Sequence, residues 1–183
     1  TTTHTLTGTL GAGDWYVEPV QVALTPQDDG CGVTRTQYRL NWGAWQPGRT
    51  FTVVAEGNNL VEYRSQDCMG QWETIRQVYV KVDTQPPQAS ILSPQQHSSA
   101  PIFTLTWGGV DPDPGSGIAT YDVQYRDGQT GTWTPFRTAA SDTSGTFAGQ
   151  RGHTYCFRVR AWDQAGNQGQ FPPGSDSCVL VDP

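Results

Sequence analysis

Three aspartates in the second half of the chain could together offer the oxygen ligands that calcium binds. Asp111 and Asp113 stand in the segment 111–117, and Asp163 opens the turn 163–167. Carboxylates are the hard oxygen ligands that Ca²⁺ takes, so the three side chains would serve one ion if both turns met at one pole of a domain. Aspartates also cap turns by accepting backbone N–H groups, and we favour that structural role over a metal site.

No set of residues in the sequence meets the requirements of catalysis. The three histidines, His4, His97 and His153, fall in expected turns or near the first residue, so none is placed to activate a nucleophile. Ser116 lies between two glycines but lacks the strand–turn–helix setting of a hydrolase serine. The sequence predicts that the chain is not an enzyme and needs no cofactor.

Tryptophan offers the remaining candidates for recognition. Trp42 and Trp72 fall in turn-rich segments, where an exposed indole ring would stack on a sugar ring or contact a partner. Trp107 is expected in a core, and Trp45 and Trp133 are expected to cover core edges. Exposed aromatic side chains also simply cover the surface of small domains, so a binding role is the alternative interpretation.

Charge and cysteine content narrow the function classes further. A net charge of −6 argues against nucleic acid and anionic membrane surfaces as partners. No apolar run is long enough to span a bilayer, so direct membrane insertion is not expected. The four cysteines, two in each half, avoid the C-x-x-C spacing. We therefore expect disulfides and an oxidising, extracellular compartment.

Alternating faces and frequent turns predict an all-β protein. In residues 155–162 the side chains of Tyr155, Phe157, Val159 and Ala161 alternate with a second set, which places the two sets on opposite faces of a strand. Turn residues recur throughout, and no segment of useful length shows a helical period. Short strands that alternate in this way are typical of an immunoglobulin-like β-sandwich.

The chain is predicted to form two such domains in tandem. Its 183 residues fit two domains of roughly 90 better than one, since each would be large enough for its own core. Pro86 and Pro87 cannot lie in a central strand and favour a stiff linker. We place the domains at residues 1–85 and 86–183. The strand and turn of residues 60–70 correspond to those of residues 155–166.

Residues 88–183 resemble a fibronectin type III domain. The resemblance rests on three segments, Phe103-Thr-Leu-Thr-Trp107, residues 116–126 and residues 152–167, which include Tyr155-Cys-Phe-Arg-Val-Arg-Ala161. The resemblance implies a seven-stranded β-sandwich with residues 155–161 as its sixth strand. The two cysteines of this half depart from the family pattern, in which disulfides are unusual.

Residues 1–85 look like the immunoglobulin-like repeats of bacterial secreted and cell-surface proteins. The segments that carry this resemblance are Leu6-Thr-Gly8, Gly13-Asp-Trp-Tyr-Val17, Asp29-Gly-Cys-Gly-Val33, Tyr38-Arg39, Trp45, Glu56-Gly57 and Tyr63-Arg-Ser-Gln-Asp67. In that family such modules accompany enzymes and adhesins as spacers or accessory domains. The resemblance implies the same for this chain.

The sandwich fold implies a cysteine pairing. Cys31 precedes one strand and Cys68 follows another, and these two strands are neighbours in a sandwich of this type. Cys156 and Cys178 both alternate away from the core on adjacent antiparallel strands, within cross-strand reach. We therefore expect the bridges Cys31–Cys68 and Cys156–Cys178. By the same alternation, Asp122 is expected beside Arg158 or Arg160.

Together these features predict a non-catalytic extracellular spacer or accessory module of a larger secreted or cell-surface bacterial protein. Its expected partners are the neighbouring domains of the parent chain, together with a polysaccharide or a surface protein. The alternative is a carbohydrate- or protein-binding adhesion module that uses Trp42, Trp72 or the loop ends.

Overall fold

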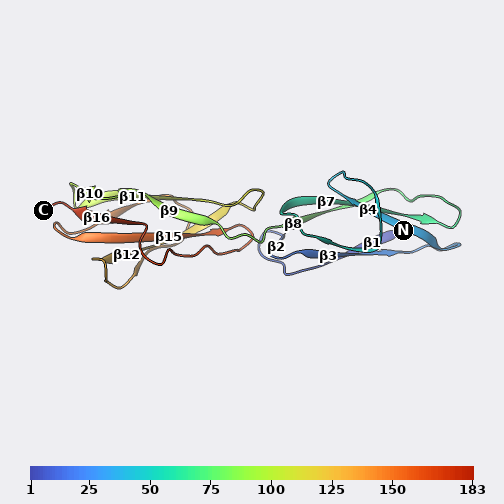
Figure 1. Cartoon of the computed structure of the whole chain (residues 1–183), viewed down its shortest axis with the longest axis horizontal. Coiled ribbons are helices and arrows are strands. Elements are labelled where there is room, and N and C mark those ends of the chain that lie inside the picture. The colour runs from blue at the N-terminus through green and yellow to red at the C-terminus, as the bar shows by residue number, and fades with distance from the viewer. The chain divides into compact units, whose positions relative to one another are not determined.

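The computed structural model of the protein describes residues 1–183 and consists of β-strands joined by turns, with no helix (Figure 1). It therefore contains no helix that could cross a membrane. The chain forms two compact units. Unit 1 comprises residues 1–84 together with 113–116, and unit 2 comprises residues 85–112 together with 117–183. The predicted all-β class with two sandwich-like domains is confirmed.

Unit 1 is built from a three-stranded and a five-stranded sheet. The first has the order β1-β3-β6, formed by β1 (Thr2–Thr7), β3 (Val20–Pro26) and β6 (Thr50–Val53). The second has the order β2-β8-β7-β4-β5, formed by β2 (Trp15–Tyr16), β8 (Arg76–Val82), β7 (Gly57–Asp67), β4 (Val33–Leu40) and β5 (Gln46–Pro47). All pairings are antiparallel except the short parallel pairing of β2 with β8.

Unit 2 repeats this plan. Its three-stranded sheet has the order β14-β11-β9, formed by β14 (Ser144–Ala148), β11 (Ile102–Val110) and β9 (Gln88–Ser93). Its five-stranded sheet has the order β10-β16-β15-β12-β13, formed by β10 (His97–Ser98), β16 (Ser177–Val181), β15 (Thr154–Asp163), β12 (Ile118–Asp127) and β13 (Thr134–Ala140). Again only one pairing, β10 with β16, is parallel.

Each unit closes its own hydrophobic core between its two sheets, because every second side chain of each strand turns inward. The core of unit 1 is mainly aliphatic and contains Val20, Val22, Leu24, Val53, Val61, Tyr63, Val80 and Val82. The core of unit 2 is rich in aromatic side chains and contains Trp107, Tyr121, Phe147, Tyr155 and Phe157 together with Ile91, Leu105, Val123, Val159, Ala161, Val179 and Val181. The predicted inward face of residues 155–161 and the core position of Trp107 are therefore confirmed.

One disulfide braces each unit. Cys31 is bridged to Cys68, and Cys156 is bridged to Cys178, as the sandwich topology predicts. The first bridge joins two exposed loop positions that flank β4 and β7. The second joins residues that lie directly opposite each other on β15 and β16, with Cys156 fully buried.

Candidate functional site

Asp163 ends β15 and organises the turn that follows it. Its side chain is only 2% exposed. One carboxylate oxygen accepts the N–H groups of Gly166 and Asn167 at 2.7 and 2.8 Å, and the other accepts the Asn167 side-chain amide at 2.9 Å. Gly166 has a φ of 100°, which an L side chain rarely adopts. The sequence Asp-x-x-Gly-Asn therefore folds as a turn around its own first carboxylate.

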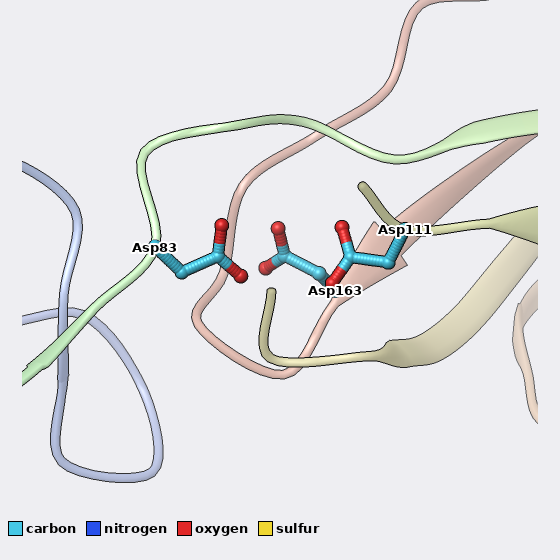
Figure 2. Close-up of side chains that lie close together, drawn as sticks. All are labelled: Asp83, Asp111 and Asp163. Atoms are coloured by element: carbon cyan, nitrogen blue, oxygen red, sulfur yellow. The ribbon is translucent and has the colours of Figure 1, made fainter. Parts of the chain in front are cut away.

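Asp111 follows β11 and lies at the same pole of unit 2 (Figure 2). It accepts the N–H of Gly117 at 2.6 Å and so closes the loop between β11 and β12. A carboxylate oxygen of Asp111 lies within 4.8 Å of one of Asp163. Figure 2 shows the two side chains next to each other. Two carboxylates at this separation would reach one cation. The hydrogen bonds of both residues show the capping role that we favour. Calcium binding stays a hypothesis, which calorimetric titration of the protein with Ca²⁺ would test.

Asp113, the third predicted calcium ligand, is exposed and does not belong to this group of carboxylates. It lies in residues 113–116, which are part of unit 1. In that unit Asp83, at the end of β8, is 1% exposed and accepts the N–H of Ser116 at 2.7 Å. Sequence reasoning assigned no role to Asp83. The available signal was an aspartate placed directly after the alternating strand β8.

Arginine and aromatic side chains alternate on the outer face of the five-stranded sheet of unit 2. The guanidinium of Arg158 lies over both Trp133 and Phe171, at 4.2 and 4.6 Å from the ring centroids. Arg126 also lies over Trp133, and Arg160 lies over Phe171. Such cation–π contacts stabilise partly desolvated side chains. They hold the loop that contains Phe171 against β15, and they show that Trp133 stacks on arginines on the outer face rather than covering a core edge as predicted.

Asp122 lies at one end of this row of arginine and aromatic side chains. Its position confirms the predicted pairing of β12 with β15, in which Asp122 lies beside Arg160. It faces Arg160 across β12 and β15, and their side chains form an ion pair at 2.9 Å. Burial of the Asp122 carboxyl raises its pKa, but hydrogen bonds lower it more. The donors are the Ala139 N–H, the Arg160 guanidinium and the Trp162 indole, so the pKa lies below the ordinary value of 3.8. Asp122 is therefore held as a carboxylate.

Unit 1 carries a shorter version of the same arrangement. Arg64 on β7 lies between Trp45 and Trp72, 4.5 Å from each ring centroid. Arg39 lies over Trp45 and forms two hydrogen bonds to Glu62, at 2.7 and 3.0 Å. Trp45, predicted at a core edge, thus lies on the outer face. The ring of Trp72 stacks on the guanidinium of Arg64, and this contact holds the loop that contains Trp72 against the sheet.

Trp42 differs from the other tryptophans because it is exposed and conformationally strained. Its side chain is 72% exposed. Asn41 and Trp42 have φ values of 47° and 60°, and the N–H of Gly43 donates to the Leu40 carbonyl at 2.8 Å. This is a turn with two left-handed central residues, for which Asn-Gly is the preferred pair. Tryptophan at the second position is unusual, since bulky residues rarely adopt positive φ.

The turn that carries Trp42 is nevertheless firmly anchored. The Asn41 side chain accepts the N–H of Leu60 at 2.8 Å and donates to the side-chain oxygen of Asn59 at 3.0 Å. Asn59 is 2% exposed and in turn donates to the carbonyls of Ala55 and Gly57. Trp42 is therefore presented to solvent from a rigid support.

Glu73 was also missed by sequence reasoning. It lies beside Trp72 and accepts the N–H groups of Thr2 and Ser65 at 2.9 and 2.8 Å. The hydroxyl of Thr2 donates to the same carboxylate. Glu73 thus ties β1, in the three-stranded sheet, to β7 in the other sheet. No local pattern in the sequence signals this long-range contact.

Comparisons with known proteins give structural neighbours and no relative in sequence. No family model matches the chain, and no curated protein matches it. Among solved structures, the fibronectin(III)-like modules of Clostridium thermocellum CbhA align with 98% of this chain and 94% of their own, at 14% identity and a TM-score of 0.42. The FN1–FN3 domains of chicken CNTN1 align with 96% of this chain and 66% of their own, at 12% identity and a TM-score of 0.36. The fold assignment rests on the sheets themselves.

Proposed function

We propose that the chain is a non-catalytic spacer or accessory segment of a larger extracellular protein, secreted or displayed at a bacterial cell surface. The observation that carries this proposal is that the side chains that could bind a ligand or take part in chemistry make structural contacts within their own unit. Asp163 and Asp111 cap turns, and Asp122 and Glu62 pair with arginines. The stacked tryptophans of both units have guanidinium groups over their rings.

Two further features support the proposal. Each unit contains a disulfide, and such bridges persist in oxidising compartments outside the cytosol. Each unit also closes a separate core, so it keeps its shape without a ligand or partner. These are the properties that a spacer between other domains requires.

A second candidate function, carbohydrate binding, is favoured by one observation, the exposed ring of Trp42. An array of neutral and acidic glycans, probed with the intact chain and with Trp42→Ala, separates the two functions. The spacer proposal predicts no glycan bound above background by either protein. Specific binding by the intact chain that Trp42→Ala abolishes would replace the spacer with a lectin-like module. Trp72→Ala is the matched control, because that ring is engaged with Arg64.

A further inference from the structure

The row of arginine and aromatic side chains on the outer face of unit 2 has a counter-charge at one end only. Arg160 is paired with Asp122 at 2.9 Å, whereas neither Arg126 nor Arg158 forms an ion pair. We propose that Arg126 and Arg158 form a binding site for an acidic peptide, an extended segment of a partner protein with carboxylate side chains at alternate positions. This inference goes beyond the proposed spacer role and does not depend on it.

Trp133 holds the two guanidinium groups in place without using their hydrogen-bond donors. The guanidinium carbons of Arg126 and Arg158 lie 4.4 and 4.2 Å from the centroid of its ring. The flat face of a guanidinium suits an aromatic ring, whereas its five N–H groups point outward in its plane. The indole ring offers these N–H groups no ordinary acceptor. The donors therefore stay available to other acceptors.

Both arginines lack an anionic acceptor. The guanidinium of Arg126 forms no hydrogen bond within the protein, and its Nε atom is buried without a partner. Arg158 donates from Nε and Nη2 to Oε1 of Gln124, at 2.9 and 2.7 Å, so its acceptor is a neutral amide. A partly buried charge without a counter-charge is costly, and buried polar groups are normally hydrogen-bonded. An added carboxylate would meet this requirement.

Like charges are crowded at this end of the row. Burial lowers the pKa of Arg158 below its ordinary value of 12.5, and repulsion from Arg126 and Arg160 lowers it further. The guanidinium nevertheless keeps its charge at neutral pH, so a bound anion would relieve the repulsion. The net charge of −6 opposes an anion at long range, but salt screens charges beyond about 8 Å at physiological ionic strength. The nearby guanidinium groups therefore dominate at contact.

The spacing of the two arginines fits carboxylates on an extended peptide. Arg126 lies opposite Cys156 in the pairing of β12 with β15, so Arg158 is its diagonal neighbour on the same face. Diagonal neighbours of this kind are roughly 7–8 Å apart. Alternate side chains of an extended strand share one face and are about 7 Å apart. Each guanidinium can then form paired hydrogen bonds with one carboxylate.

A long polyanion fits this surface less well than a peptide does. Nucleic acids carry a charge on every unit and bind through many basic contacts. The row offers two guanidinium groups without a counter-charge, and the acidic remainder of the protein repels the other charges of such a polymer. A peptide with two suitably spaced carboxylates needs no more than this site provides.

Calorimetric titration of the full chain with a short synthetic peptide of alternating Glu and Thr, at low salt, tests the site. The intact chain should bind the peptide, and a peptide of alternating Gln and Thr should not bind. Arg126→Gln should lower the affinity by at least about tenfold, since it removes hydrogen bonds to a charged acceptor. Arg151→Gln is the matched control, because it removes the same charge from the same unit at an exposed position outside the row. It should bind like the intact chain.

Two further measurements separate paired hydrogen bonding from attraction by charge alone. Arg126→Lys keeps the charge but lacks the planar fork, so it should lose most of the affinity that Arg126→Gln loses. A peptide of the same composition with its Glu residues in one block should bind more weakly, because successive side chains of a strand point to opposite faces. Unfolding transitions of the variants verify that each is folded.

Four outcomes would overturn the proposal. They are an intact chain that does not bind the alternating peptide, an Arg151→Gln control that loses as much affinity as Arg126→Gln, an Arg126→Lys protein that binds as tightly as the intact chain, and equal binding of the alternating and block peptides. Tighter binding of single-stranded DNA or dextran sulfate than of the peptide would likewise assign the two arginines to another class of polyanion and reject the acidic peptide.

Discussion

The two units share one plan of sheets but stabilise it with different side chains. Unit 1 fills its core mainly with valines, whereas unit 2 fills the same space with interlocking aromatic rings. In unit 2 the ring of Phe147 contacts five other aromatic rings, with centroid distances from 4.9 to 5.7 Å. Large rings concentrate packing energy in a few residues, while valines distribute it. The core of unit 2 is therefore packed around one residue, Phe147, whereas the core of unit 1 has no residue of this kind.

The largest expected effect follows from this difference. Phe147→Ala should lower the free energy of unfolding of unit 2 by about 3–5 kcal/mol, because it leaves a cavity at the centre of the aromatic cluster. Val22→Ala, the matched change in unit 1, removes two buried methyl groups and should cost about 2 kcal/mol. Calorimetry combined with hydrogen exchange assigns each transition to its unit. Equal losses would show that the aromatic cluster is no more central than a valine.

The disulfides give the second comparison. The bridges close loops with sequence separations of 37 and 22 residues, so each should contribute about 3–4 kcal/mol by loop closure. They differ in access, since Cys31 and Cys68 are exposed whereas Cys156 is fully buried. A mild thiol reductant should therefore open Cys31–Cys68 first while unit 2 stays folded. Alkylation followed by peptide mapping over time checks the order, and simultaneous reduction of both bridges would contradict it.

The ion pairs provide a smaller effect that depends on pH. Asp122→Asn should destabilise unit 2 by about 1–3 kcal/mol at pH 7, because a charged acceptor of three hydrogen bonds is lost. The pKa of Asp122 is lower in the folded protein than its ordinary 3.8, so the stabilisation is complete above that value and is lost as the pH falls below it. Denaturation at pH 7 and pH 2.5 measures this. A difference between the two proteins that persists unchanged at pH 2.5 would be inconsistent with the pKa shift.

Much of the fold could be predicted from local pattern. Alternation placed Phe157 and Val159 inward and Asp122 beside Arg160, since a strand repeats every two residues. The positions of Trp45 and Trp133 were predicted wrongly, because an arginine on a neighbouring strand can hold a tryptophan on an outer face. The role of Glu73 could not be predicted, since its partner Thr2 is 71 residues away in the sequence.

The candidate site shows the same limit. The sequence placed Asp111 and Asp163 in turns that could meet at one pole of a sandwich, and their carboxylates do lie near each other there. Asp113, which was named with them, lies outside this group. Sequence reasoning treated Trp42 and Trp72 as equivalent, since both fall in turns. Only the backbone angles and the neighbouring Arg64 distinguish them. Side chains in turns are positioned by contacts that have no period along the chain.

The central claim is that the tryptophans of the outer surface serve the structure, with Trp42 as the exception. The most direct test is urea denaturation of Trp42→Gly and Trp72→Ala at low protein concentration. Trp42→Gly should raise the free energy of unfolding by about 0.5–1 kcal/mol, because Asn-Gly suits the left-handed turn. Trp72→Ala should lower it by about 1 kcal/mol, through loss of the Arg64 contact. Opposite signs are the predicted result, and a loss of stability in Trp42→Gly as large as that in Trp72→Ala would contradict the account.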